Sequence, residues 1–463
     1  MSRLPLVQTW GLETGPAGEL LLCAHSLPAL ADTFGTPLHV IHCQRLRATA
    51  AEFLAAFRAA YPGKLSVHYA FKCNSLPFVA GLLRRCGLGA EIMSELELEL
   101  ALRLGYRGFE IVVNGPAKSD SFLQRCVNEQ VRLIVVDSLE ELVSLDGICR
   151  RTGTPADILL RINPGYVPRG MNSGSATASR RGCAFGLDLR GGEVTQGLDM
   201  LRGIPLLRCR GFHLHIGTGI RDARDYSDAL QCLRRLRDLA AAAGCRIDIL
   251  DLGGGFAVPS SCEMTSCELF FYQTLGILPT SWRRRTADGF ADFAAAISGT
   301  IARFFPGSSL PELLLEPGRC LVSSSQLLLL KVIRVKERPG IRKWLITDGG
   351  LGTVTLPTFY EHHELLLAND ANRQPWEKVT IIGPVCFAGD IVYRNKLMPV
   401  VRSGEVLALM DSGAYFLAWE SSFGFSRPAV VAVDGESVAC VRRAESLDDM
   451  VARDAWNNIE TKK

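Results

Sequence analysis

The stretch Ser66–Asn74, "SVHYAFKCN", decides how the chain is read, because it places one lysine at the end of a short apolar strand. Lysine is a poor strand residue and is costly to bury. Lys72 is therefore a surface residue with a snorkelling side chain, half of a buried ion pair, or an amine recruited for chemistry. The stretch alone leaves these three alternatives open.

This run is the first of eight β-rich runs, and helix-like stretches such as 94–105 and 138–153 separate them. Alternation of strands and helices predicts βαβ units and a parallel sheet. Eight such runs in about 250 residues are typical of a (β/α)8 barrel, with a doubly wound open sheet as the alternative. The runs are 66–72, 89–94, 109–115, 132–138, 157–164, 209–217, 247–255 and 312–319.

After Cys320 the pattern changes to strands with few helices between them, which predicts a mostly antiparallel β domain. An earlier run, "PLHVIHC" at 37–43, is counted with the barrel. Two segments, 165–182 and 257–289, interrupt the barrel pattern and are read as long loops on the carboxyl side of strands. Loops of that length are usually disordered or functional.

Composition narrows the class of protein. The 463 residues are 48% hydrophobic and carry a net charge of +3, so neither nucleic acid nor an anionic membrane is indicated as a partner. We see no apolar run that spans a bilayer and no export signal at the N-terminus. The fifteen cysteines are scattered without a CxxC pair, which predicts reduced thiols in a cytoplasmic protein and no metal site.

Polar and titratable residues end almost every predicted barrel strand. In this fold the carboxyl ends of the strands converge on one mouth, where such barrels carry out chemistry. A structural barrel has no need of so many polar groups at that mouth. The residues are Lys72, Glu91, Ser94, Asn114, Asp137, Arg161, Asn163, His213, His215, Gly253, Gly254, Gly255, Glu316 and Arg319.

The last two strand ends together indicate a phosphate site. The glycines of "DLGGGF", 251–256, let backbone N–H groups approach an anion, and Arg319 in "EPGR" offers a guanidinium fork. Phosphate sites in these barrels commonly follow strands seven and eight. A glycine triplet alone is more often a tight turn. The arginine after the next strand is what favours a phosphate site.

A lysine, a phosphate site and an acid together fit pyridoxal phosphate (PLP). Lys72 could form a Schiff base with its aldehyde, and Glu316 could keep its ring nitrogen protonated, which makes the ring an electron sink. His215 could lie against the ring or be a hydrogen-bonded core histidine. An unprotonated amine at Lys72 requires a lowered pKa, which burial favours.

The motifs in their order resemble the fold-type III PLP-dependent decarboxylases, the group of diaminopimelate, ornithine and arginine decarboxylases. The order is most similar to that of diaminopimelate decarboxylases, and the resemblance spans about 34–454. It rests on "YAFKCN", "GAEIMSELELELAL", "GFHLHIGTG", "DLGGGF", "EPGRCLV", "DGG", "GPVCFAGD" and "DSGAYFLAWESSFGFSRPAVVAVDG".

The resemblance implies a fold, with a PLP-binding barrel at 36–318 and a β domain at 319–463 that 1–35 joins. It also implies site residues. Lys72 holds the cofactor, His215 stacks on the ring, and Glu316 pairs with its nitrogen. The phosphate site is formed by Gly253, Gly254, Gly255, Arg319 and Tyr415, while Glu91, Ser94, Glu97 and Arg161 lie around the cofactor.

The resemblance further implies how the reaction proceeds. Loss of carbon dioxide leaves a carbanion, and Cys386 or a water that it positions returns a proton as general acid. In the family this cysteine comes from the neighbouring subunit, so a homodimer with shared active sites is implied. The resemblance also places Asp348, Leu356, Tyr360 and Phe387 at the substrate, which is expected to be an amino acid, a small molecule.

Two of these positions depart from the family pattern. Phe387 follows the cysteine where an acid is expected to hold a distal amine, and Leu356 stands where an arginine is expected for a distal carboxylate. An unpaired charged end costs several kcal/mol of specificity. We therefore expect poor activity on meso-diaminopimelate, lysine or ornithine. An apolar or bulky distal end, or a substrate carried on a partner protein, fits better.

Three other functions compete with decarboxylation. A PLP-dependent racemase shares the barrel and cofactor, but Cys386 and Asp348 favour the decarboxylase. A catalytically silent regulatory relative would be expected to lack the lysine or the phosphate ligands. A nicotinamide dehydrogenase is the weakest alternative, since no G-x-G-x-x-G opens a helix near the N-terminus.

Overall fold

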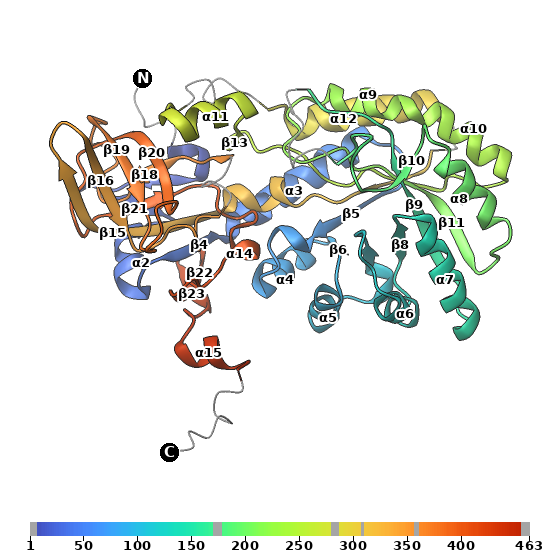
Figure 1. The fold of residues 1–463 in the computed structure, drawn as a ribbon, viewed down its shortest axis with the longest axis horizontal. Helices are drawn as coiled ribbons and strands as arrows, with labels where there is room; N and C mark the ends of the chain where they lie inside the picture. Colours follow the sequence, from blue (N-terminus) through green and yellow to red (C-terminus); the bar gives the residue numbers. More distant parts are fainter. Residues whose placement is uncertain (1–6, 170–177, 279–286, 307–309, 356–360, 455–463) are drawn as a thin grey trace, which may run out of the picture. The chain divides into compact units, whose positions relative to one another are not determined.

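The chain folds into two compact units, shown in Figure 1. The structure is a computed structural model that describes residues 7–169, 178–278, 287–306, 310–355 and 361–454. The barrel unit comprises 47–259 and 283–322. The β unit comprises 1–46, 260–282 and 323–463.

The barrel unit is a closed ring of eight parallel strands. Pairing runs around the ring in the order β9, β11, β12, β14, β5, β6, β7, β8 and back to β9. The (β/α)8 prediction is therefore confirmed, and the open-sheet alternative is excluded. The strands are β5 (Leu65–Ala70), β6 (Gly89–Ile92), β7 (Ile111–Val113), β8 (Leu133–Val136), β9 (Ala156–Asn163), β11 (Leu207–His213), β12 (Ile249–Asp251) and β14 (Glu312–Leu315).

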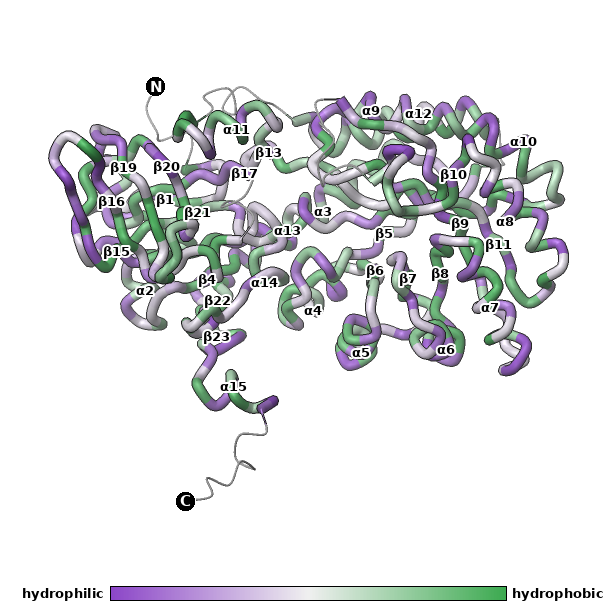
Figure 2. The backbone as a smooth tube through the Cα atoms, viewed as in Figure 1, coloured by the Kyte–Doolittle hydropathy of each residue, from purple (hydrophilic) through white to green (hydrophobic). Residues whose placement is uncertain are grey.

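Amphipathic helices cover the outside of the ring. In α5 (Glu95–Arg103) glutamates and leucines alternate, so purple and green segments succeed each other along it in Figure 2. Within the described residues no helix is both long and apolar enough to cross a bilayer. The other helices of this unit are α4 (Pro77–Arg85), α6 (Asp120–Asn128), α7 (Leu139–Thr152), α8 (Glu193–Leu201), α9 (Arg224–Ala229), α10 (Leu233–Ala243), α12 (Phe290–Phe304) and α13 (Arg319–Val322), while α3 (Cys43–Ala60) leads into it.

Serine caps set where three of these helices begin. The hydroxyl oxygens of Ser94, Ser119 and Ser138 accept hydrogen bonds from the third backbone N–H of α5, α6 and α7. Such caps satisfy donors that have no partner within the helix. α5 and α7 therefore start within three residues of the strands that precede them, and this fixes the polar residues at those strand ends.

The β unit is a mostly antiparallel sheet built from both chain ends. Its main path runs β20, β19, β16, β15, β4, β22, β23, with β21 and β18 branching from β15. Two pairs on this path, β16 with β19 and β4 with β22, are parallel. The strands are β4 (Leu38–His42), β15 (Gln326–Arg338), β16 (Arg342–Thr347), β18 (Leu365–Leu367), β19 (Glu377–Ile382), β20 (Ile391–Met398), β21 (Val406–Leu409), β22 (Ala429–Asp434) and β23 (Ser437–Arg442).

Strand β15 separates two apolar cores. Leu327 and Leu329 belong to one core, and Leu328 and Leu330 belong to the other. Successive side chains of a strand point to opposite faces, so one run of leucines serves both. The smaller elements of the unit are β1 (Leu12–Thr14), β2 (Leu20–Leu22), β3 (His25–Ser26), β13 (Cys262–Glu263), β17 (Glu361–His362), α2 (Leu27–Phe34), α11 (Ser266–Leu275), α14 (Phe416–Trp419) and α15 (Leu447–Val451).

The unit boundaries differ from those expected at 35 and 318. The run at 37–43 forms β4, which pairs with β15 and β22 rather than with barrel strands. Four of its five residues are buried, and a continuous apolar run does not reveal which sheet it joins. At the other boundary, α13 still belongs to the barrel unit.

The insertion 257–289 is not a plain loop. It contains β13, which pairs with β17, and α11, which begins at a capping box between Thr265 and Glu268. The helix is tied to the β unit because the Tyr272 hydroxyl accepts the Arg394 N–H at 2.9 Å. The pattern "TSCE" is a capping-box signal that could have predicted this helix.

Replacement of Gly211 tests the bulge between β11 and its neighbours. Gly211 has φ 145°, and a Cβ there would overlap the carbonyl oxygen of Ile249. We expect Gly211→Ala to destabilise the protein by about 2 kcal/mol or more, since backbone would have to shift. Chemical denaturation followed by circular dichroism measures the change.

Gly299 is the matched control for this substitution. It lies inside α12 with no atom within 4 Å of an added Cβ. Gly299→Ala is expected to leave stability unchanged or raise it by about 0.5–1 kcal/mol through helix propensity. Equal midpoints for the two variants would contradict the close approach at Gly211.

Candidate active site

Lys72 forms an ion pair at the mouth of the barrel. It lies in a single 3₁₀ turn, Phe71–Cys73, directly after β5, and its Nζ is 2.6 Å from Oε2 of Glu91 on β6. The Glu91 side chain is fully buried, whereas that of Lys72 is 35% exposed. Burial raises the pKa of Glu91, and the charge of Lys72 opposes that rise. The surface-lysine alternative is therefore wrong.

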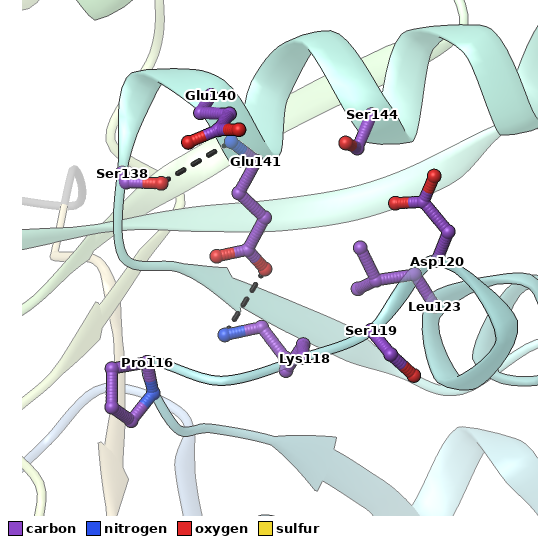
Figure 3. A pocket seen from close by; sticks show the side chains of 9 residues that line it. All are labelled: Pro116, Lys118, Ser119, Asp120, Leu123, Ser138, Glu140, Glu141 and Ser144. Atoms are coloured by element: carbon purple, nitrogen blue, oxygen red, sulfur yellow. Dashed lines mark hydrogen bonds and ion pairs between the residues drawn. The ribbon is translucent and has the colours of Figure 1, made fainter.

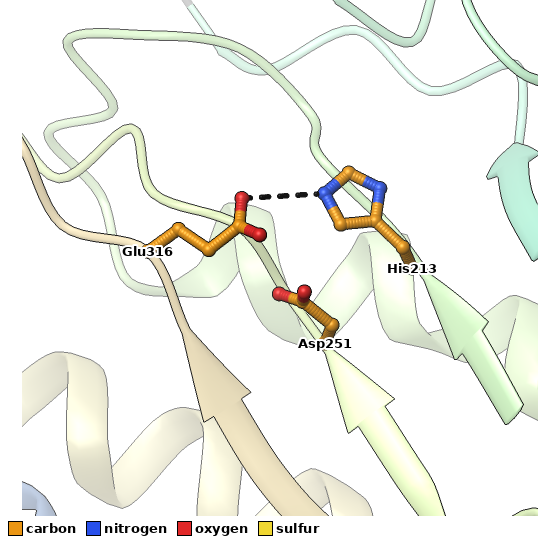
Figure 4. A group of neighbouring side chains, drawn as sticks. All are labelled: His213, Asp251 and Glu316. Atoms are coloured by element: carbon orange, nitrogen blue, oxygen red, sulfur yellow. Dashed lines mark ion pairs between the residues drawn. The ribbon is translucent and has the colours of Figure 1, made fainter. Parts of the chain in front are cut away.

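A second polar group gathers at the ends of β11, β12 and β14. Figure 4 shows His213, Asp251 and Glu316 turned toward one another. His213 Nε2 is 3.5 Å from a Glu316 oxygen, and the Asn114 amide donates a 2.7 Å hydrogen bond to the other oxygen. All four side chains are buried. The sequence analysis gave Asp251 no role, although it stands two residues before the glycine run.

The carboxyl groups of this cluster titrate differently. Burial and the neighbouring Glu316 raise the pKa of Asp251 well above its usual range. Burial acts in the same direction on Glu316, but its hydrogen bond and charge interaction with His213 and the charge of Lys72 outweigh it and lower the pKa. Glu316 therefore stays ionised at neutral pH, while the pKa of Asp251 shifts in the opposite direction.

Three atoms of the cluster are left for a ligand. Within the described residues, His213 Nδ1, Asp251 Oδ2 and Asn114 Oδ1 are buried without a hydrogen-bond partner. Buried polar atoms are normally satisfied, so such atoms call for an explanation. A cation or a protonated ring nitrogen placed against Glu316 would suit this negative, buried environment.

The glycine run forms a tight turn beside His215. A Cβ at Gly253 would lie 2.6 Å from His215 Nδ1, and a Cβ at Gly254 or Gly255 would overlap the carbonyl oxygen of Glu316 or Gly217. Gly253 and Gly255 also have positive φ values of 62° and 101°. Only glycine allows this close approach.

His215 follows β11 and is stacked with His213 at 6.5 Å between ring centroids and 28° between planes. Burial lowers the pKa of His215 well below its usual range, and the nearby Arg161 acts in the same direction. The imidazole is therefore neutral and offers a flat face. The structure brings it to the mouth where the sequence analysis expected it.

Two buried arginines add positive charge. Arg319, the first residue of α13, is 6% exposed at the end of the β14 connection. Arg161 on β9 lies 3.5 Å from Asp137, and its guanidinium carbon is 4.5 Å from the centre of the Phe185 ring. Both arginines are in the barrel unit with Lys72, as expected for groups around an anionic cofactor.

Ser94 and Glu97 have a structural role that the sequence analysis did not foresee. Ser94 accepts the Glu97 N–H at 3.2 Å, and Glu97 Oε2 accepts the Met93 N–H at 2.8 Å. Burial raises the pKa of Glu97 to about 7. These bonds cap α5 and so fix the segment that follows Glu91.

The remaining predicted residues belong to the β unit. Asp348 accepts the Lys331 N–H at 2.9 Å within the sheet, and Cys386 is exposed in a turn before β20. Tyr415 precedes α14 with φ 66°, and its carbonyl oxygen accepts a hydrogen bond from Thr355 at 3.3 Å. Their contributions to the barrel site stay predictions. Leu356 and Tyr360 lie outside the described residues.

Asp390 is a residue that the sequence analysis missed. It is buried, and its two carboxylate oxygens accept the backbone N–H groups of Leu351 at 2.6 Å and Val385 at 2.8 Å. It thereby links the turn that carries Cys386 to the segment after "DGG". An aspartate at the end of a glycine-containing turn is a signal for such bonds.

A hollow of about 210 Å³ lies between the starts of α6 and α7, shown in Figure 3. Its floor is the buried ion pair of Lys118 with Glu141, at 3.0 Å. Glu141 also accepts the Asp137 N–H at 3.0 Å. These bonds satisfy the pair within the fold, so we assign it a structural role.

The barrel mouth therefore combines an amine, an ionised acid, a neutral imidazole face and a glycine turn near a buried arginine. These groups fit PLP, which needs an amine for its aldehyde, an acid for its ring nitrogen and donors for its phosphate. The unsatisfied atoms around Glu316 and the absence of room for a Cβ along the glycine turn support this fit.

Comparison with known proteins gives the family. A model of the pyridoxal-binding domain of pyridoxal-dependent decarboxylases matches residues 47–323. Diaminopimelate decarboxylase of Methanocaldococcus jannaschii is 28% identical over 445 residues, covering 94% of this chain and 95% of the relative. That of Actinosynnema pretiosum subsp. auranticum is 32% identical over 465 residues, covering 98% and 97%.

Two solved structures match this chain over nearly its whole length. The crystal structure of Methanocaldococcus jannaschii diaminopimelate decarboxylase in complex with L-lysine matches with a TM-score of 0.84 at 26% identity, covering 96% of this chain and 97% of that one. The crystal structure of AQ1208 from Aquifex aeolicus matches with a TM-score of 0.81 at 27% identity, covering 97% of this chain and 99% of that one.

These matches extend over nearly the whole chain, and the family model includes every barrel residue of the site described above. The cofactor is PLP, and the reaction is the decarboxylation of an amino acid. The chain belongs to the pyridoxal-dependent decarboxylase family, in the fold-type III group that contains diaminopimelate decarboxylases.

Proposed function

We propose that this enzyme decarboxylates an amino acid with an uncharged distal end and acts poorly on meso-diaminopimelate. The observation that carries the proposal is Phe387, which follows Cys386 where the family pattern has an acid. Its side chain is 55% exposed, and its ring packs against Gly389. A distal ammonium group placed there would meet an apolar ring and lose its ionic partner, which costs several kcal/mol of specificity.

The distal end could also belong to a substrate attached to a partner protein. A tethered amino acid has no free charge at its point of attachment, so an apolar position suits it equally well. The curated relatives described above are named for diaminopimelate, and Phe387 is the feature that separates this chain from that substrate. Leu356, at the position of the expected arginine, points in the same direction on sequence grounds.

Within the barrel we assign each residue a role in holding PLP. Lys72 would hold the aldehyde carbon, and Glu91, 2.6 Å from its Nζ, orients the amine. Glu316 would accept a hydrogen bond from the protonated ring nitrogen. Asn114 and His213 hold the Glu316 carboxylate in place. His215 would cover one face of the ring. Gly253, Gly254, Gly255 and Arg319, with Tyr415 of the β unit, would bind the phosphate.

The chain's own residues then control charge and protons. When bound, PLP supplies an electron sink for the pair of electrons left by the departing carboxyl group. Glu316 is ionised. Its negative charge would keep the ring nitrogen of bound PLP protonated, which makes the electron sink effective. Cys386, exposed on a turn fixed by Asp390, is the proposed donor of the returning proton.

We also propose that the working enzyme is a homodimer in which Cys386 serves the barrel of its partner. Support comes from the family resemblance of "GPVCFAGD" and from the exposure of Cys386 and Phe387 on the β unit. Exposed catalytic residues on a turn are suited to completing the site of a second copy.

Lys72→Ala tests the cofactor lysine. We expect decarboxylation to fall about a thousandfold or more, and borohydride reduction to attach no cofactor to the barrel, because the amine is gone. Mass spectrometry of the reduced protein and carbon dioxide release give the two readouts. Lys64→Ala, at the exposed opposite end of β5, is the control and should behave as wild type. Labelling that persists in Lys72→Ala would move the site to another amine.

Phe387→Glu tests the substrate proposal. Restoring an acid should raise kcat/KM for meso-diaminopimelate or lysine about tenfold or more relative to wild type, because the distal ammonium regains a partner. Phe387→Leu keeps the position apolar and should not. Carbon dioxide release across charged and apolar amino acids measures both variants. Efficient turnover of meso-diaminopimelate by the wild-type enzyme would refute the proposal.

Mixing two inactive variants tests the shared site. Lys72→Ala and Cys386→Ser subunits, dissociated and reassociated together, should recover about a quarter of wild-type activity, since half of the dimers carry one intact site. Activity that stays at the sum of the parents after confirmed subunit exchange would place Lys72 and Cys386 of one site in the same chain. Each variant reassociated alone is the control.

A further inference from the structure

A hollow of about 260 Å³ lies at the amino ends of β5, β6, β7 and β8, and all of its lining residues belong to the barrel unit. Leu65 and Gly89 are the first residues of β5 and β6, while Glu110 and Arg132 directly precede β7 and β8. Because these strands are parallel, the hollow is at the end of the ring opposite the candidate active site. None of the roles assigned above to the barrel residues uses it.

Positive charge exceeds negative charge around this hollow, which three arginines and one glutamate line. Arg58 is in the last turn of α3, and Arg84 is in the last turn of α4. The third arginine, Arg132, is paired with Glu312. That carboxylate is already shared with a second cation, because Lys64 lies 2.8 Å from it. The hollow is therefore an environment that favours an anion.

Arg84 is held in place with one donor unused. Its Nη2 donates to the Gly105 carbonyl oxygen at 2.6 Å, and its guanidinium carbon is 5.2 Å from the centre of the Tyr106 ring. Within the described residues its Nε is buried without a hydrogen-bond partner. An arginine in a last helical turn often balances the helix dipole, but this one is turned to a different segment of the chain.

His68 is the second group at the hollow with an unused hydrogen-bonding atom. Its side chain on β5 is 4% exposed, and in the part of the chain that the structure describes its Nδ1 has no partner. Gly89 makes room for the imidazole, since an added Cβ there would overlap the ring. Burial and the charge of Arg132 lower the pKa of His68 to about 3, so the neutral ring has one N–H to donate. Buried polar atoms normally have partners, and a ligand would supply one.

We propose that this hollow binds a small oxyanion, the carboxylate or phosphate group of a compact molecule, through Arg58, Arg84 and His68. A guanidinium fork matches the paired oxygens of both groups. The volume is below the roughly 300–1,000 Å³ of pockets for drug-sized ligands, which limits the ligand to a short body. Leu54 and Phe109 offer that body apolar contacts. This site is independent of the proposed substrate.

The first test titrates the full-length holoenzyme by calorimetry with inorganic phosphate and, separately, with succinate, while sodium chloride keeps the ionic strength constant. Bound PLP fills the phosphate site of the barrel mouth, so added phosphate reports on a second site. At least one of the two anions should bind with a Kd below about 5 mM. A preference for phosphate indicates a phosphorylated ligand, and a preference for succinate indicates a carboxylic acid. A Kd above that value for both anions would overturn the proposal.

Arg58→Gln tests whether the binding belongs to the hollow. Arg58 is exposed, so its replacement leaves the core untouched. Loss of one charge-assisted hydrogen bond should weaken the preferred anion about tenfold or more. Arg235→Gln, on the exposed side of α10, is the matched control and should bind as wild type does. Unchanged affinity in Arg58→Gln would overturn the proposal.

Arginine modification by phenylglyoxal tests the same site in the wild-type holoenzyme, without any variant. Peptide mass mapping follows the rate at each arginine with and without the preferred anion. At about ten times its Kd, the anion should slow modification of Arg58 and Arg84 about tenfold and leave Arg235 unaffected. Protection of Arg161 or Arg319 instead would place the anion at the barrel mouth and overturn the proposal, and so would equal protection of Arg235.

Discussion

The pairing of β5 with β14 is the interaction on which the site depends. These strands are about 250 positions apart in sequence, and three register pairs join them, Leu65 with Leu313, Ser66 with Leu314 and Val67 with Leu315. The contact continues beyond the strands, where Ala70 N donates to Pro317 O at 3.2 Å. Because parallel strands end at the same edge, this closure brings the segment with Lys72 beside the segment with Glu316. Without it the amine and the acid would belong to separate edges of an open sheet.

The acids that this closure brings together differ in their pKa values, and this difference suits the binding of a cofactor. Three buried carboxyl groups, Glu91, Asp251 and Glu316, face the mouth, with Lys72 and Arg161 as nearby cations. Burial raises the pKa values of Glu91 and Asp251, whereas interactions with His213 and the charge of Lys72 lower that of Glu316. An ionised, buried acid with a histidine and an amide to hold it is suited to a protonated ring nitrogen. The positive charge of a protonated cofactor ring would thus be balanced by the negative charge of Glu316.

Much of this could be predicted from the sequence, because short apolar strands that end in polar residues carry their own signal. All eight barrel strands form where the pattern placed them, and Lys72, Glu91, His215 and Glu316 come together at the mouth. The sequence pattern gave wrong predictions where a strand's partners are set by distant parts of the chain. Strand β4 is buried on both faces, so its sequence does not tell which sheet receives it. Helix α11 was missed because an insertion in a barrel was read as a loop despite its capping box.

Asp251 and Asp390 were missed for another reason. Each acts through hydrogen bonds to backbone N–H groups that only the folded chain brings close. Asp251 accepts the Gly253 N–H at 2.8 Å and so shapes the glycine turn, while its other oxygen faces the cluster around Glu316. A carboxylate read from sequence suggests acid–base chemistry, but here it organises the turn that carries such chemistry. Residue type alone does not separate these two roles.

The turn around Cys386 allows the side chain at position 387 to vary while the backbone of the turn stays in place. Phe387 N donates to Val385 O at 2.7 Å, and Phe387 O accepts the Asp390 N–H at 3.0 Å, so the backbone of residue 387 is fixed within the turn. Asp390 then anchors the turn through Leu351 and Val385. None of these bonds uses the side chain of residue 387, which is largely exposed. An acid or a phenylalanine can therefore occupy the position at little structural cost, and under the proposed function the choice between them would act on the substrate rather than on the fold.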